Sequence, residues 1–540
     1  MSERDLRAGT DTETTLRTRP RAGLRTSAQP REAVRKGVRL AELLCPLAAA
    51  ADAAAMLPPD TAQRTALIAV GLGRVLNFPA DSQADLLHAG LVRHLGCSAT
   101  SHEETRLMGD DFELRDAMNP VDRGSPLELL KGASRGFAKQ LPPMRRARVV
   151  ASFMARAPIV MPRIFSARCE VSARLARRLG LSDAAVRALD EAYERFDGKG
   201  LPRRRRGEGQ SPLSGVLAVA EWVAMFLPLP GGETLALDAL ARRAGGQFDP
   251  AVVGALVGAR EEILAPARRD APLTALLDAE PDPHRAMGDP REVAQVLADF
   301  ADIKSTFTLG HSRRVATLAR DAARAQGLAA AAVDAVELAG WLHDLGRVSV
   351  SNAIWDKPGP LDAGEWDKVR AHAHFTDRVL AAAAPFAAVG WLATADHERM
   401  DGRGYPRGAA PSGAARILAA ADLVAALSEP RPHRPAHAAD RVAAIAVEEA
   451  ASGRLDRAAV NAVLEAAGGT TLRAELPRGL TEREVDVLRL LARGHVDKEI
   501  ATSLGISHRT VHHHNQSIFA KLEVKTRGAA ALAAMECGVI

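Results

Sequence analysis

Residues 395–408 read ADHERMDGRGYPRG, and residues 192–204 read AYERFDGKGLPRR. Both stretches run Glu-Arg, then Asp-Gly, a basic residue, Gly and later Pro in the same order, but His397 of the later stretch is replaced by Tyr193 in the earlier one. A phrase that recurs at this length indicates an internal repeat, which changes the fold prediction for the whole chain.

Four more pairs of segments repeat in the same order. The later members read LAGWLHDLGR (338–347), HSRRVATLA (311–319), RILAAADLVAAL (416–427) and LDRAAVNAVL (455–464). The earlier members read, respectively, HAGLVRHLGC (88–97), TAQRTALIA (61–69), GVLAVAEWVAMF (215–226) and FDPAVVGALV (248–257). We therefore predict one helical unit over 41–270, a linker over 271–296 and a second unit over 297–470. The first unit carries an insertion at 98–132 that is polar and poorly periodic, so we expect a surface excursion there.

The composition favours a soluble protein built of helices. Of 540 residues, 47% are apolar, 25% are charged and only 4% are aromatic, which suits helices packed closely through Ala and Leu. No run of about 18 apolar residues is free of charge, so we expect no membrane span and a cytoplasmic location. The four cysteines are far apart and form no CxxC pair, so a zinc knuckle or a redox pair is not expected.

Residues 1–40 are rich in Arg, Thr and Pro and have no apolar period. They also lack the apolar segment of a secretory signal. We expect a disordered basic tail, which would be either a solvated leader or a non-specific aid to DNA binding.

The second unit carries imidazole and carboxylate groups that suit a metal centre. Asp422 lies in an otherwise apolar stretch, where an unpaired carboxylate would be costly to bury. A mixed nitrogen and oxygen set without thiolate favours iron or manganese. The candidate ligands are His311, His343, Asp344, His372, Asp396, His397 and Asp422. They exceed the needs of one ion, so we predict a binuclear centre that shares Asp344, bridges a phosphoryl oxygen and generates a hydroxide nucleophile.

The stretches HDLGR (343–347), DKPGPLDAGEW (356–366) and HERMDGRGYPRG (397–408) resemble the HD-GYP family of HD-fold phosphohydrolases. The resemblance implies an all-helical fold, a centre of two or three metals, and hydrolysis of cyclic di-GMP with His343 and Asp344 as catalytic residues. It also implies that substrate phosphates and the pocket are contacted by Arg347, Lys357, Tyr405 and Arg416.

Three residues depart from the family pattern. Asp396 replaces the first histidine of the usual HHE, Arg347 replaces a lysine, and Phe307 stands where members with three metals have glutamate. A carboxylate can still ligate, so Asp396 would change metal preference or rate, whereas Phe307 argues against a third ion. The alternative is that these histidines are core side chains and that no hydrolysis occurs.

The matching positions of the first unit do not suit a metal. They are Thr61, Arg93, His94, Arg168, Ala192, Tyr193 and Glu221. Arginine is always cationic and cannot ligate a metal, so Arg93 and Arg168 would repel a divalent ion. We interpret the first unit as a metal-free copy. It would either pack against the second unit or sense a ligand, with the two arginines paired to an anion or to Glu221.

The stretch from Leu480 predicts a helix-turn-helix. Thr481 and Glu484 form a capping box, a short helix ends at Gly505, and Ser507 caps a helix over 508–522. The motifs LTEREVDVL (480–488), DKEIATSLGIS (497–507) and KLEVKTR (521–527) resemble the LuxR-type DNA-binding domain over 476–540. The resemblance implies four helices, with the helix from His508 in the major groove and a last helix, 526–537, that pairs two copies on DNA. The residues expected at the DNA are Arg509, Thr510, His512, His513, Asn515, Gln516 and Lys521.

These features predict an all-α protein with two HD-fold helical bundles in tandem, followed by a four-helix LuxR-type domain. The leading hypothesis is a cytoplasmic transcriptional regulator that binds double-stranded DNA as a homodimer, and whose second unit binds and cleaves cyclic di-GMP or a related cyclic dinucleotide. The alternative is a non-catalytic, ligand-sensing transcription factor in which both helical units are structural or sensory.

Overall fold

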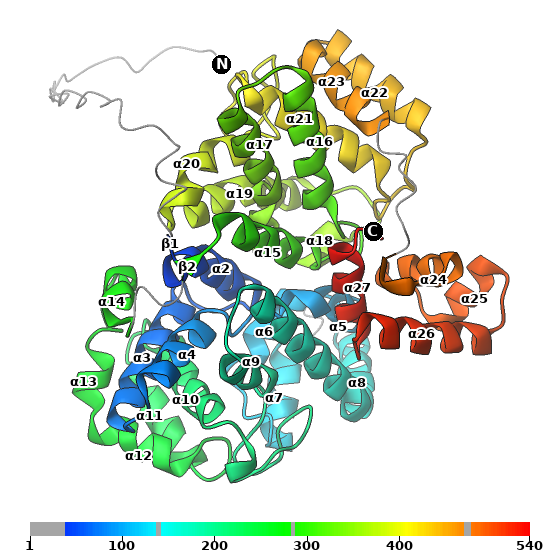
Figure 1. Ribbon diagram of the computed structural model, residues 1–540. Coiled ribbons are helices and arrows are strands. Elements are labelled where there is room, and N and C mark those ends of the chain that lie inside the picture. The colour runs from blue at the N-terminus through cyan, green and yellow to red at the C-terminus, as the bar shows by residue number, and fades with distance from the viewer. Residues whose placement is uncertain (1–37, 137–141, 282–286, 469–476) are drawn as a thin grey trace, which may run out of the picture. The chain divides into compact units, whose positions relative to one another are not determined.

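The computed structural model describes residues 38–136, 142–281, 287–468 and 477–540, and the regular secondary structure of these ranges is almost all helical (Figure 1). Two short strands, β1 (Val38–Arg39) and β2 (Met287–Gly288), pair antiparallel and form the one sheet of the described ranges. The all-α prediction is confirmed. The predicted tail lies outside the described residues except for its last three positions, and so does the middle of the predicted linker.

The first unit follows β1 and is built of helices throughout. Its helices are α2 (Leu40–Ala54), α3 (Thr61–Val75), α4 (Ala80–Leu91), α5 (Ser101–Met108), α6 (Asp111–Met118), α7 (Pro126–Gly136), α8 (Pro143–Arg178), α9 (Asp183–Asp190), α10 (Pro212–Phe226), α11 (Gly232–Arg243), α12 (Pro250–Gly258), α13 (Arg260–Leu264) and α14 (Pro272–Ala279). Short 3-10 turns lie at Ser98–Thr100 and Gly207–Gly209. Helix α3 packs between α4 and α10, so the apolar faces of these three helices form the centre of this unit. Helix α14 falls within the predicted linker.

The second unit repeats this arrangement. Its helices are α15 (Pro290–Asp302), α16 (His311–Ala325), α17 (Ala330–Leu342), α18 (Asn352–Trp355), α19 (Ala363–Leu380), α20 (Ala384–Ala393), α21 (Ala414–Ser428), α22 (Ala439–Ala451) and α23 (Arg457–Gly468), with a 3-10 turn at Leu345–Ser349. Helix α16 packs against α17 and α21, just as α3 packs against α4 and α10 in the first unit.

Matching glycines set the spacing of the helix pairs at matching places of the two units. A Cβ at Gly90 of α4 would lie 2.8 Å from the Cα of Ala66 in α3. A Cβ at Gly340 of α17 would lie 2.6 Å from the Cα of Ala316 in α16. In both units only glycine permits this close approach of two helix backbones, so the repeated phrases of the sequence carry the same packing contact.

The insertion in the first unit is folded, and the expectation of a polar surface excursion is wrong for it. It forms α5, α6 and α7, and Asp111 at the start of α6 is fully buried. The Asp111 carboxylate lies 3.1 Å from Nζ of Lys304 and accepts hydrogen bonds from the hydroxyl of Ser351 and the backbone N–H of Asn352. Charged residues that form ion pairs inside a protein cannot be distinguished from surface residues by sequence alone.

One helix of the described residues, α8, is long and apolar enough to cross a membrane by length and composition. The sequence predicts no membrane span, because no run of about 18 apolar residues is free of charge. The core helix of a water-soluble protein passes the same test, so this one helix is weak evidence for a membrane span. Its first half is largely exposed, whereas its second half is packed into the first unit.

The C-terminal domain has the four predicted helices, α24 (Glu482–Ala492), α25 (Asp497–Leu504), α26 (His508–Leu522) and α27 (Arg527–Glu536), after a 3-10 turn at Pro477–Gly479. The predicted capping box is present: the Thr481 backbone N–H donates to the Glu484 carboxylate, and the Glu484 N–H donates to the Thr481 hydroxyl. Gly505 ends α25 with φ at 64°, and Ser507 caps α26. Helix α26 has the predicted bounds because both of its ends are set by neighbours in the sequence.

We predict that Asp111→Ala lowers the stability of the protein substantially. Without this carboxylate the Lys304 ammonium, whose side chain is 2% exposed, stays buried without its ionic partner, and breaking such a buried pair costs about 3–5 kcal/mol. Differential scanning calorimetry measures the fall in the unfolding temperature. Asp116→Ala, at an exposed position of the same helix, is the matched control, and equal effects of both substitutions would contradict the assigned role.

Candidate metal centre and DNA-reading helix

All seven residues predicted as metal ligands gather in the second unit. Asp344, His372, Asp396 and His397 form one group, and His311, His343 and Asp422 form a second group. Within each group the candidate ligand atoms lie within 4.8 Å of one another. All of these side chains are buried except that of His397, which is half-buried. Over the described ranges, no other group of three or more His, Cys, Asp or Glu residues meets the same distance criterion.

Helix ends and one close backbone approach place these side chains. His311 is the first residue of α16, and His343 and Asp344 follow directly after α17. Helix α19 can approach them because residue 346 is glycine: a Cβ there would lie 1.9 Å from the carbonyl oxygen of His372. The glycine of the HDLGR phrase therefore brings His372 next to the His-Asp pair.

The imidazoles are held with Nε2 available as the ligand atom. Nδ1 of His311 lies 2.9 Å from Oε2 of Glu429. Nδ1 of His343 and Nδ1 of His372 each lie within hydrogen-bond distance of the carbonyl oxygen three residues earlier. For His343 and His372 such a partner keeps the proton on Nδ1 and leaves Nε2 free, whereas Nε2 of His311 lies 3.2 Å from Oδ1 of Asp422. Within the described chain, Nε2 of His343 and Nε2 of His372 are buried without a hydrogen-bond partner.

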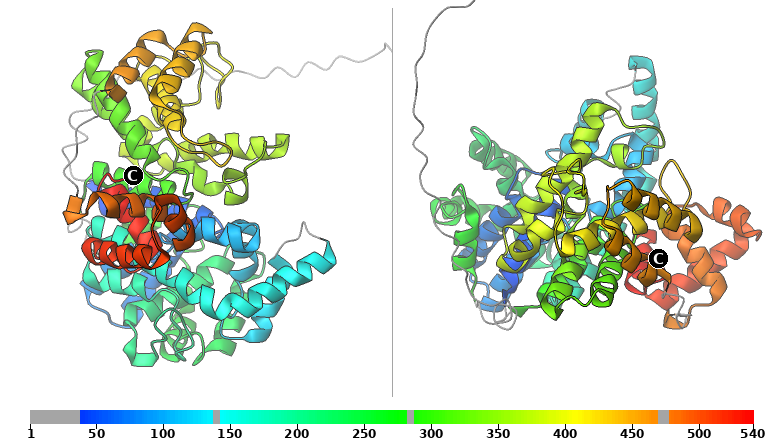
Figure 2. Two further views of the ribbon diagram at one scale, coloured as in Figure 1. Left: turned by 90° about the vertical axis from the view of Figure 1, so that its right-hand side faces the viewer. Right: turned by 90° about the horizontal axis from the view of Figure 1, so that it is seen from above.

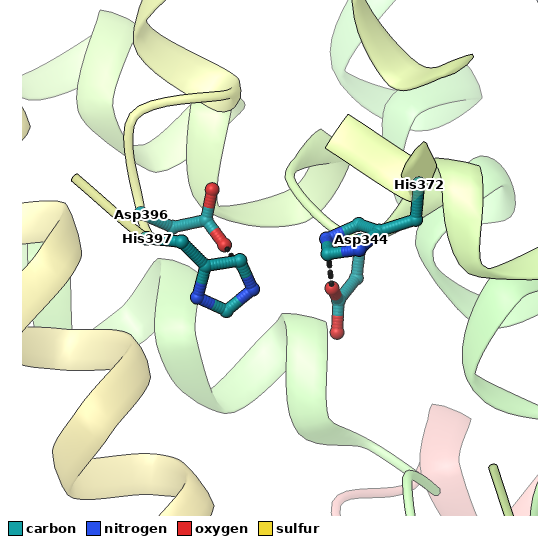
Figure 3. Close-up of side chains that lie close together, drawn as sticks. All are labelled: Asp344, His372, Asp396 and His397. Atoms are coloured by element: carbon teal, nitrogen blue, oxygen red, sulfur yellow. Dashed lines mark ion pairs between the residues drawn. The ribbon is translucent and has the colours of Figure 1, made fainter. Parts of the chain in front are cut away.

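Asp344 belongs to the first group, which Figure 3 shows, and also faces the second group. Its Oδ2 lies 3.5 Å from Nε2 of His343 and 3.6 Å from Nε2 of His311. Its Oδ1 lies 3.7 Å from Nε2 of His372, and Figure 3 shows this pair facing Asp396 across a gap. Because its two oxygens face different groups, this carboxylate has the geometry of a bridging ligand.

Asp396, which replaces a family histidine, is fully buried near two other carboxylates. Its Oδ2 lies 3.2 Å from Nε2 of His397, but neither of its oxygens accepts a hydrogen bond from the described chain. Burial, together with Asp422 and Asp344, raises the pKa of Asp396 well above its ordinary value. A divalent cation would satisfy both oxygens and remove this repulsion, so the residues present fit a metal centre.

Two of the four predicted substrate residues border the ligand groups. Nη1 of Arg347 lies 2.7 Å from Oδ2 of Asp344, and its guanidinium carbon is 3.9 Å from the centroid of the Trp355 ring. The ring centroid of Tyr405 lies 4.6 Å from that of His397. A cation and an aromatic ring therefore lie at the edge of the centre.

The other two predicted substrate residues make ion pairs of their own. Nζ of Lys357 lies 2.6 Å from Oε2 of Glu365, and Nη1 of Arg416 lies 3.4 Å from Oδ2 of Asp456. Both cationic side chains are about one third or more exposed, and pairs of this kind are worth at most about 1 kcal/mol.

Glu429 is a residue of this centre that the sequence analysis missed. It is buried at the end of α21 and, besides its contact with His311, it lies 3.3 Å from Nε of Arg314 and 3.2 Å from Nη1 of Arg431. It follows directly after the last residue of α21, about two helical turns beyond Asp422, so it lies at the end of the helix face that carries Asp422. That spacing is the signal that would have identified it.

At the matching place of the first unit, the side chain of Arg93 lies where the second unit has candidate metal ligands. Arg93 forms an ion pair with Glu221, and Nε2 of His94 lies 3.2 Å from Oε1 of Glu221. Burial lowers the pKa of His94, but Glu221 and Cys97 outweigh burial and raise it to about 10. Two cationic side chains therefore neutralise the Glu221 carboxylate without a metal.

Arg168, which matches His372 in the repeat, pairs with a residue of the insertion. Its guanidinium contacts the Glu104 carboxylate, and its Nε donates to the Thr100 hydroxyl at 2.9 Å. Of the two arginines expected to contact Glu221 or an anion, only Arg93 contacts Glu221. The close backbone approach is kept, since a Cβ at Gly96 would lie 2.0 Å from the carbonyl oxygen of Arg168.

Helix α26 presents most of the predicted DNA-contacting residues to solvent. The exposed ones are Arg509, Thr510, His512, His513 and Gln516. Asn515 is instead 8% exposed, and its side-chain amide donates to Oδ1 of Asp497 at 3.0 Å. This contact joins α26 to α25 inside the domain. Lys521 is half-buried, with Nζ 2.7 Å from Oε2 of Glu484.

Two family models match the chain. The model described as "HD domain" matches residues 295–459, which include all seven candidate ligands. The model described as "Bacterial regulatory proteins, luxR family" matches residues 478–534, which include the helix-turn-helix.

The chain is similar to several bacterial proteins. The 3'3'-cGAMP-specific phosphodiesterase 3 of Vibrio cholerae is 30% identical over 427 residues, which are 76% of this chain and 90% of that protein. The cyclic di-GMP phosphodiesterase response regulator RpfG of Xanthomonas campestris is 34% identical over 31% of this chain and 44% of its own length. The response regulator protein VraR of Staphylococcus aureus is 43% identical over 68 residues, or 13% of this chain and 32% of its own length.

A solved structure has the same fold over most of the chain. The crystal structure of a cyclic GMP-AMP specific phosphodiesterase of V. cholerae superposes with a TM-score of 0.55 at 25% identity. The match covers 82% of this chain and 100% of that chain. It is longer than the second unit alone, so the first unit takes part in the similarity.

We predict that Glu429→Gln weakens metal binding by about 10- to 100-fold, because the imidazole of His311 loses the carboxylate that orients it and raises its basicity. Competition with a chelator, followed by elemental analysis, measures the affinity. Glu448→Gln, at an exposed position of α22, should leave the affinity unchanged. An affinity of Glu429→Gln equal to that of the parent would contradict the role given to Glu429.

Proposed function

Because the chain belongs to the HD-GYP family of HD-domain phosphodiesterases, we propose that it is a DNA-binding transcriptional regulator whose second unit hydrolyses a cyclic dinucleotide. The observation that carries this proposal is the gathering of seven ligand-type side chains in two groups on either side of Asp344. Proteins similar to the second unit are described as phosphodiesterases of 3'3'-cGAMP or of cyclic di-GMP. These two nucleotides define the substrate class that we propose.

The proposed cofactor is a pair of divalent ions, iron or manganese, held by the two ligand groups. The donors are imidazole nitrogens and carboxylate oxygens without thiolate, which suits these metals. When bound, such ions polarise a phosphodiester oxygen and supply hydroxide at neutral pH. Asp344 would contribute one oxygen to each ion, and the Nδ1 partners of the histidines would hold their rings in place.

The remaining groups of the centre would orient the substrate. The guanidinium of Arg347 lies at the edge of the ligand groups, where its planar fork suits a phosphate oxygen pair. The ring of Tyr405 covers His397 and offers a surface for a base or ribose. Lys357 and Arg416 would exchange the partly exposed carboxylates of Glu365 and Asp456 for a substrate phosphate, at small cost.

One contact favours a second candidate function. Arg347 places its guanidinium on Oδ2 of Asp344, the oxygen that faces His311 and His343. A permanent cation on that oxygen competes with a metal ion. If the guanidinium prevails, the unit would bind a cyclic nucleotide without cleaving it, and the protein would be a ligand-sensing transcription factor.

We propose that the first unit is a degenerate copy of the second. The recurring glycine contacts and the Arg93–Glu221 pair support this, since they are consistent with a retained scaffold and a replaced metal centre. Its buried contact from Asp111 to Lys304 supports a role in holding the second unit.

We also propose that the protein binds palindromic DNA as a homodimer through α27. Helix α27 packs along α8, and Arg174 and Arg178 of α8 pair with Glu536 at the end of α27. Two copies would therefore pair through α27 only after it leaves α8. Nucleotide occupancy that alters this packing would change DNA affinity by thermodynamic linkage.

We predict that Asp344→Ala lowers turnover of cyclic di-GMP and 3'3'-cGAMP by about a thousandfold and removes bound metal, because both groups lose their shared carboxylate. Chromatography of the linear product and elemental analysis measure the two effects. Asp334→Ala, at an exposed position of α17, is the control. A parent protein that binds the nucleotides but does not cleave them with manganese or iron would support the sensor function instead.

We predict that Arg509→Ala weakens binding to the target DNA by about 1–3 kcal/mol, because its exposed guanidinium lies in the first turn of α26. Fluorescence anisotropy at fixed salt measures the affinity. Arg324→Ala on α16 should bind as the parent does. Asn515→Ala should lower the thermal stability of the C-terminal domain through the lost bond to Asp497. An unchanged affinity of Arg509→Ala would count against α26 as the reading helix.

A further inference from the structure

The inserted segment of the first unit surrounds an apolar cavity. Helices α5, α6 and α7 with the middle of α8 (Figure 2, cyan) border a cavity of about 320 Å³. These helices have their own small hydrophobic cluster around Met108, Leu114 and Met118, separate from the main core. Protein interiors contain few voids larger than a water molecule, whereas ligand sites commonly measure about 300–1,000 Å³. The size of this cavity is therefore that of a ligand site.

The lining of the cavity suits a flexible apolar chain. Four methionines line it: Met108, Met118, Met154 and Met161. Methionine side chains are unbranched and adapt to the shape of the group they contact. Further apolar lining comes from Leu114, Leu129, Phe153, Ile164 and Phe165, among others.

The same cavity is bordered by cations without carboxylate partners. Arg123, Lys199 and Arg204 line it, and none of them forms an ion pair within the described part of the chain. Glu104 is the one carboxylate of the lining, and it already pairs with Arg115 and Arg168. The lining therefore has an excess of positive charge.

Arg123 marks the polar end of the cavity. Its guanidinium carbon lies 5.2 Å from the centroid of the Phe165 ring and 5.6 Å from that of Tyr193. It also lines the neighbouring cavity of about 140 Å³ at the place that matches the metal centre of the second unit. Burial lowers the pKa of Arg123, so an anion beside this guanidinium would relieve the cost of burying its charge.

We propose that this cavity binds an amphipathic anion of the fatty-acid class. The apolar chain would lie among the methionines, and the carboxylate or phosphate head would lie against Arg123 and Lys199. The insertion supplies Arg123 and two of the methionines, so the site is absent from the second unit, which lacks this segment. The inference is independent of the proposed hydrolysis, because it uses no residue of the candidate metal centre.

Decanoate, 1-decanol and butyrate test the head and the chain separately in titration calorimetry of the full-length protein. Decanoate should bind saturably at one site, 1-decanol should bind about tenfold more weakly, and butyrate should not bind. The double variant Arg123→Gln, Lys199→Gln should weaken decanoate binding by about tenfold or more. Arg441→Gln, at an exposed position of α22, and Asp344→Ala should bind decanoate as the parent does.

Three results would overturn the proposal. The first is the absence of saturable decanoate binding to the parent protein. The second is an equal affinity of the double variant and the Arg441→Gln control, with circular dichroism showing that both are folded. The third is co-sedimentation with phosphatidylglycerol vesicles without saturable decanoate binding, which would assign the exposed Met144 and Ile159 of α8 to a membrane surface instead.

Discussion

A carboxylate buried on an apolar helix must be neutralised, and the two units meet this requirement with different cations. In the second unit Asp422 of α21 faces histidines that also suit a metal. In the first unit Glu221 of α10 faces the guanidinium of Arg93, which is part of the chain. A metal ion can be exchanged and can act on a substrate, whereas an arginine only balances charge. One fold can therefore keep its packing in both units while metal chemistry is confined to one of them.

The parts of the structure that could be predicted from the sequence are set either by residues close together in the chain or by complete family motifs. The capping box at Thr481 and the bounds of the helix 508–522 follow from local rules. Contacts between distant residues could not be predicted. In the sequence Asp111 resembles a surface residue. Its burial depends on the contact with Lys304, which is far along the chain. The burial of Asn515 could not be predicted either. Its partner, Asp497, belongs to the preceding helix, so its exposure depends on how the two helices cross.

The contact made by Asp111 matters for the candidate metal centre because of where its partners lie. Lys304 belongs to the loop that leads into His311, and Asn352 follows the turn after the His-Asp pair. The insertion of the first unit therefore holds both segments that lead to the ligands of the second unit. A substitution that loosens α6 would change the positions of those residues without altering any of them, so the geometry of the candidate metal centre depends on the packing of the first unit.

The length of helix α8 and the two prolines inside it affect how motion can be transmitted along the first unit. It is 36 residues long, or roughly 54 Å at a rise of ~1.5 Å per residue. Pro158 and Pro162 interrupt its backbone hydrogen bonds, and such positions are where helices bend. The methionine-lined cavity lies against the proline segment itself, because its lining runs along α8 from Phe153 to Arg168, and Arg174 and Arg178, which hold Glu536, lie beyond it. A hinge motion of ~10° at the prolines would move the C-terminal end of α8 by roughly 4 Å.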